Sequence, residues 1–63
     1  MFEVGQVYVL VLEDGDGYQK ELRGCRMIDF AGGLIKVEHG DKILIVNTAS
    51  NRFLYAWRPK SEN

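Results

Sequence analysis

The sequence predicts a single all-β domain built from five short strands. Apolar, β-branched and aromatic residues occur in short runs or alternate with polar residues, a pattern typical of strands. Clusters of glycine, aspartate and asparagine separate these runs, as expected of tight turns. No stretch repeats its apolar residues with the helical period of about 3.6 residues. The expected fold is therefore one sheet of short strands joined by tight connections.

The length of 63 residues leaves room for one hydrophobic core. We therefore expect residues 1–63 to form a single domain, with a frayed tail at 60–63. Folding of so short a chain leaves little surplus stability, and small domains commonly add disulfides, a metal or a partner subunit. Cys25 is the one cysteine, so a disulfide within the chain is impossible. A dimer or larger homo-oligomer is the expected source of extra stability.

The first two strands are predicted at residues 7–12 and at about 21–29. Residues 7–12 are all apolar, and the two Asp-Gly pairs that follow them end the strand in a long loop. The alternation of the second strand breaks at Gly24, where a β-bulge would let the strand bend.

The third and fourth strands are predicted to form a hairpin. Residues 34–38 follow a pair of glycines and place Ile35 and Val37 on one face of the strand. A tight turn at 39–41 then leads into a returning strand at 42–47.

The last strand is predicted at residues 53–57, before Pro59 removes a backbone donor. The residues before it, 47–51, carry short polar side chains that bond their own backbone. They favour a turn or one short 3₁₀ turn over a strand.

This order of elements resembles an SH3-like small β-barrel. The resemblance rests on the five strands, the long first loop, the tight hairpin between the third and fourth strands, and the 3₁₀ turn before the fifth. At a finer level, residues 33–37 and 45–50, followed by Phe53 and Ala56, are similar to a group of short uncharacterised bacterial proteins. The resemblance implies a five-stranded barrel and brings no activity with it, because small barrels carry many functions.

The sequence predicts no enzyme, no cofactor and no metal site. A calcium loop begun at Asp14 would need ligands or glycine where the chain has Tyr18, Gln19 and Cys25. The glycine pairs precede strands, whereas phosphate-binding loops precede a helix. The one histidine, His39, lies in the predicted hairpin turn, away from any recognisable nucleophile pattern.

We expect a cytoplasmic protein with no membrane partner. A single unpaired cysteine fits a reducing compartment, and the first residues lack the pattern of a secretory signal. The longest apolar run, at residues 7–12, is far too short to cross a bilayer as a helix.

The first strand presents apolar side chains on both faces, which predicts a subunit interface. Val7, Val9 and Val11 lie opposite Tyr8, Leu10 and Leu12, although one face of a small sheet normally meets water. We assign Val7, Val9 and Val11 to a contact with a second subunit. The alternative is that curvature of the sheet and the long first loop cover these residues within one chain.

The last strand combines aromatic and basic residues, which predicts a ligand surface. The residues assigned to it are Arg52, Tyr55, Trp57 and Arg58. Such side chains can grip a proline-rich peptide or stack the bases of a single nucleic-acid strand. The net charge of −1 argues against nucleic acid. The leading hypothesis is a non-enzymatic, homo-oligomeric protein-binding or assembly module, and the alternative is a nucleic-acid-binding barrel.

Overall fold

The computed structural model describes residues 2–59, which form five β-strands and no helix. The strands are β1 (Val7–Glu13), β2 (Gln19–Ala31), β3 (Leu34–His39), β4 (Lys42–Asn47) and β5 (Phe53–Trp57). The all-β class and the places of the five predicted strands are confirmed, although β2 extends further at both ends than expected. The tail predicted at 60–63 lies outside the described residues.

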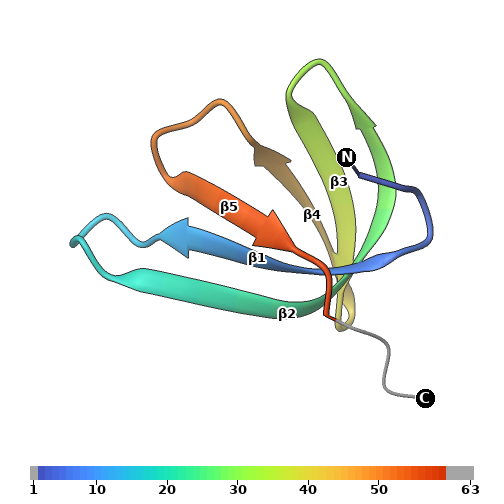
Figure 1. The fold of residues 1–63 in the computed structure, drawn as a ribbon, viewed down its shortest axis with the longest axis horizontal. Helices are drawn as coiled ribbons and strands as arrows, with labels where there is room; N and C mark the ends of the chain where they lie inside the picture. The colour runs from blue at the N-terminus through green and yellow to red at the C-terminus, as the bar shows by residue number, and fades with distance from the viewer. Residues whose placement is uncertain (1, 60–63) are drawn as a thin grey trace.

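The strands form one curved antiparallel sheet in the order β4-β3-β2-β1-β5 (Figure 1). β1 to β4 pair in succession, and β5 returns to lie beside β1. Within residues 2–59, β4 and β5 each pair with one strand only, so the sheet is not closed into a barrel. Both edges therefore carry unpaired backbone groups.

Bulges interrupt three of the four strand pairs. Between the pairs Tyr8↔Cys25 and Leu10↔Leu22, β2 has one residue more than β1, and Gly24 there adopts a φ of +73°. The bulge predicted at Gly24 is therefore confirmed. The β3–β4 ladder runs from its two-residue turn for six residue pairs without a shift.

The connection before β5 is built from two separate turns, and the predicted 3₁₀ turn is wrong. The amide of Ser50 donates to the carbonyl of Asn47, and the amide of Phe53 donates to the carbonyl of Ser50. The Asn47 and Ser50 side chains also accept bonds from the amides two residues further along. These local side-chain bonds close single turns and take the place of consecutive helical bonds.

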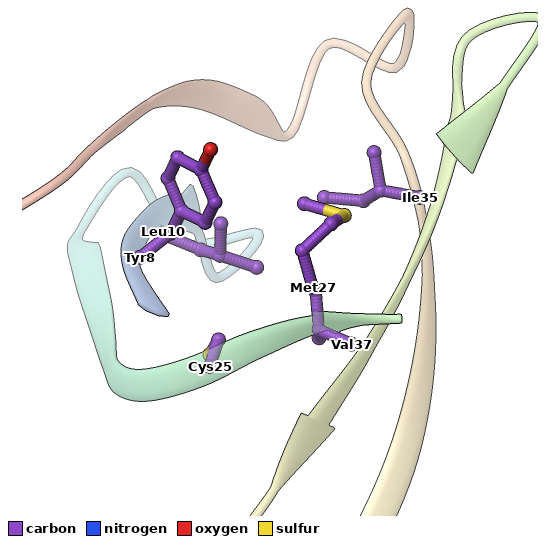
Figure 2. Close-up of a cluster of buried hydrophobic side chains, with 6 residues drawn as sticks. All are labelled: Tyr8, Leu10, Cys25, Met27, Ile35 and Val37. Carbon is purple, nitrogen blue, oxygen red and sulfur yellow. The ribbon is translucent and has the colours of Figure 1, made fainter. Parts of the chain in front are cut away.

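The core lies on the inner face of the curved sheet. Figure 2 shows six side chains gathered there from three neighbouring strands, each at most 3% exposed. They are Tyr8, Leu10, Cys25, Met27, Ile35 and Val37. The alternation predicted for β3 is confirmed, because Ile35 and Val37 both belong to this cluster. Ile35 and Val37 lie on the same face because side chains two residues apart in a strand point to the same side of the sheet.

The N-terminal segment crosses the inner face beside the core. The Phe2 ring packs edge-on against Tyr8, with 5.2 Å between ring centroids. The amide of Gly5 donates to the Met27 carbonyl, and the amide of Met27 donates to the Gln6 carbonyl. These bonds fix the segment along β2 and bring its side chains toward the end of β5.

Candidate functional site

The outer face of β1 is covered by the chain itself. Val9 pairs with Trp57 and Val11 pairs with Tyr55, and each valine is only 1% exposed. Cross-strand partners of this kind lie on one face of a sheet and contact each other. The chain itself therefore covers Val9 and Val11, and the covering side chains come from β5.

Of the three valines assigned to a subunit interface, Val7 is the exposed one, with 42% of its surface accessible to solvent. It pairs with Arg26 and lies before the start of the β1–β5 ladder. Val9 and Val11 have no surface to offer a partner unless the side chains above them move. The exposed surface above Val9 and Val11 consists of the residues that cover them.

The covering residues form an aromatic and cationic patch that includes an arginine missed by the sequence assignment. The Arg23 guanidinium carbon lies 5.6 Å from the centroid of the Trp57 ring, within range of a cation–π contact. Tyr55 is 51% exposed and Trp57 39% exposed on the same face. Arg23 comes from the bulge of β2, so the strand that supplies it is far from β5 in sequence.

The charges of this patch are paired. Arg23 forms an ion pair with Glu21, with an N–O distance of 3.0 Å between exposed side chains. Arg26, further along β2, pairs with Glu38 of β3. Each arginine on this face therefore has a neighbouring carboxylate that offsets its positive charge.

Arg52 and Arg58 lie at opposite ends of β5, so the structure does not bring the four predicted residues together. The Arg52 guanidinium lies beside Gly15 in the first loop, close enough for its nearest nitrogen to be 3.4 Å from a Cβ built there. The Arg52 carbonyl accepts a bond from the amide of Glu13. Arg58 instead contacts the N-terminal segment, at 3.4 Å from Glu3 Oε1 and 3.1 Å from Gln6 Oε1.

The free edge of β4 carries a second apolar surface. Ile43 is 55% exposed and Ile45 67% exposed on the outer face, where their β3 partners are Glu38 and Lys36. A shallow hollow of about 210 Å³ beside Ile45 is lined mainly by apolar residues. The unbroken apolar run at 43–46 already indicates that this strand is apolar on both faces.

The side chains of Cys25 and of Asp14 in the acidic first loop form hydrogen bonds with the backbone of the protein. The Cys25 thiol is fully buried, donates to the Leu22 carbonyl at 3.3 Å, and has its pKa raised by burial. Asp14 Oδ1 accepts bonds from the amides of Asp16 and Tyr18, which closes the loop on itself. Among residues 2–59, no three His, Cys, Asp or Glu side chains are grouped so as to hold a metal ion. The same part of the chain has no helix able to span a bilayer.

In comparisons with protein families, curated proteins and solved structures, nothing matches this chain. The resemblance to an SH3-like barrel and to short bacterial proteins thus has no support from relatives. The interpretation of the site rests on the geometry of the sheet and its two free edges.

Proposed function

We propose that this protein is a non-enzymatic assembly module of SH3-like topology that forms a homodimer through the free edge of β4 in the reducing cytoplasm. The observation that carries the proposal is an exposed, regular and apolar sheet edge. Its outward isoleucines, Ile43 and Ile45, are 55% and 67% exposed. An edge of this kind is a template for pairing with another chain.

The centre of the β4 edge lacks the proline, charge or bulge by which proteins commonly protect a free strand, and its one lysine, Lys42, lies at its first position. Residues 43–46 are isoleucine, leucine or valine, with no proline and no charge among them. The strand also lacks the register shift found in the three other strand pairs. By contrast, β5 is shorter, has an extra residue at Leu54 relative to β1, and is followed by Pro59. Of the two edges, β4 is the better suited to add a strand.

A second copy is the partner that fits this edge. Two β4 strands can pair antiparallel about a two-fold axis, which makes the interface self-complementary. When the axis passes at Leu44, Ile43 of one copy lies opposite Ile45 of the other, and both sit on the outer face. The four isoleucines then form one apolar stripe between the Lys36 and Glu38 rows of the two copies. An apolar centre with a charged rim is the usual anatomy of a subunit interface.

The SH3-like topology is supported by three features. β1 to β4 form a meander, and β5 returns beside β1. Tight two-residue turns join β2 to β3 and β3 to β4. The bulge at Gly24 bends β2 in its middle, which is how a short sheet begins to wrap around its core.

Single-stranded nucleic acid on the Tyr55 and Trp57 face is the second candidate. The placement of Tyr55 and Trp57 on the same face as Arg23 favours it, because bases stack on such surfaces. The pairing of Arg23 with Glu21 and the net charge of −1 weaken it. A salt-sensitive change in Trp57 fluorescence on titration with an oligonucleotide would bring this candidate ahead of assembly.

The assembly proposal is tested by Ile45→Lys. The side chain points outward with 67% exposure, so the variant should fold as the native chain does. In the dimer, the new lysines would place two positive charges within one apolar stripe, where they lose solvation without gaining a partner. Sedimentation equilibrium at micromolar concentration should give a dimer for the native chain and a monomer for Ile45→Lys.

Val4→Lys is the matched control, because Val4 is 61% exposed and lies outside β4. It makes the same change in net charge and should remain a dimer. The proposal fails if the native chain is a monomer across this concentration range. It also fails if Ile45→Lys and Val4→Lys have the same oligomeric state.

A further inference from the structure

A hollow lies where β5 meets the N-terminal segment, apart from the β4 edge. It has a volume of about 480 Å³. Its lining residues are Phe2, Tyr8, Phe53, Ala56, Trp57 and Arg58. This volume lies within the range of small-molecule sites, about 300–1,000 Å³.

The walls of the hollow are apolar and largely aromatic. Phe2 and Tyr8, whose rings pack edge-on with 5.2 Å between centroids, line it together with Phe53 and Ala56. Phe53 and Ala56 are partly buried and pack against the core cluster. An aromatic wall of this kind favours a hydrocarbon or aromatic group over a polar one.

Arg58 gives the hollow its polarity, because it is the one charged group among the described residues that line it. Its guanidinium already contacts oxygen atoms of Glu3 and Gln6, at 3.4 and 3.1 Å. The two ion-paired side chains remain 49% and 62% exposed, so the internal contact is open to competition. A guanidinium favours a carboxylate over a neutral group, because its N–H donors match the two oxygens.

We propose that this hollow binds a small amphiphilic carboxylate, whose apolar part lies between Phe2 and Phe53 and whose carboxylate replaces Glu3 on Arg58. The internal carboxylate then acts as a competitor for the same guanidinium. Removing Glu3 should strengthen binding, and removing the charge of Arg58 should weaken it. These opposite effects distinguish a charge-selected site from nonspecific apolar adsorption.

Decanoate is a suitable probe, with decanol and decyltrimethylammonium as uncharged and cationic analogues. Binding is measured through the fluorescence of Trp57, the one tryptophan, which lines the hollow. Arg58→Gln should weaken decanoate binding about fivefold, as expected for one partly exposed ion pair. Glu3→Gln should strengthen it about twofold or more, and decanol should respond to neither substitution.

Lys36→Gln is the matched control for loss of a cation, because Lys36 is exposed on the outer face of β3 and should leave decanoate binding unchanged. The measurements are repeated on Ile45→Lys, so that a failure of the β4 interface leaves this test intact. The proposal is overturned if decanoate and decanol respond alike to Arg58→Gln, or if the cationic analogue binds as tightly. Binding confined to the Ile45→Lys monomer would also overturn it, because the hollow would then be covered by a second copy.

Discussion

Replacement of Gly24 by alanine isolates the energetic cost of the bulge in β2. Gly24 has a φ of +73°, and no atom lies within 4 Å of a Cβ built at this position. The cost of Gly24→Ala is therefore backbone strain without a steric clash. A left-handed conformation costs an alanine about 1–2 kcal/mol, partly offset by the lower entropy of its unfolded chain, about 0.4–1 kcal/mol. We expect a net loss of about 1 kcal/mol.

The assay is thermal or urea unfolding at one fixed protein concentration, followed by Trp57 fluorescence. A loss of about 1 kcal/mol lowers the Tm of a domain of this size by about 4–8 °C. Gly24→Asn is the comparison, because asparagine adopts the left-handed region more readily than alanine and should lose less stability. The reasoning is refuted if alanine matches glycine in stability, or if asparagine destabilises as much as alanine.

Two further predictions concern the outer face of β1 and the buried thiol of Cys25. Val9→Lys should abolish the folded state, because Val9 is 1% exposed and a lysine there would bury an unpaired charge. Val7→Lys, at a site 42% exposed, should retain the β-sheet circular dichroism. If Val9→Lys were equally folded, the burial of Val9 beneath β5 would be contradicted. Burial raises the pKa of Cys25, so the native state favours the neutral thiol. The stability that this thiol contributes should therefore decrease above about pH 8.5, where the thiol of the unfolded chain ionises. Unfolding of the native chain and of Cys25→Ala from pH 7 to pH 10 should show this difference, and parallel profiles would contradict it.

Much of the fold could be predicted from sequence because local chemistry decides it. The paired glycines between β2 and β3 both adopt positive φ, which fixes a two-residue turn and the register of the strands beside it. The alternation around Ile35 and Val37 then determines which face is buried. The two single turns before β5 could not be predicted in the same way, because short polar side chains can close either a single turn or a 3₁₀ turn.

The candidate site was harder to predict, because its geometry depends on residues distant in sequence. Alternation shows that β1 is apolar on both faces, but the cover of Val9 comes from Trp57 on β5 and from the Arg23 bulge of β2. Arg52 and Arg58 are separated for a simpler reason. A strand advances about 3.3 Å per residue, so residues at its two ends lie far apart even when the segment between them is continuous.

The placement of the bulges links the shape of the sheet to its proposed assembly. Extra residues in β2 and β5 raise the local twist and bend the sheet around its core. The β3–β4 hairpin has no such bulge, so β4 keeps six consecutive pairs in regular register and presents a regular outer edge. A bulged edge resists the addition of another strand, whereas a regular apolar edge invites it. The same distribution of bulges that covers Val9 and Val11 within one chain therefore leaves Ile43 and Ile45 as the apolar surface that a second copy would cover.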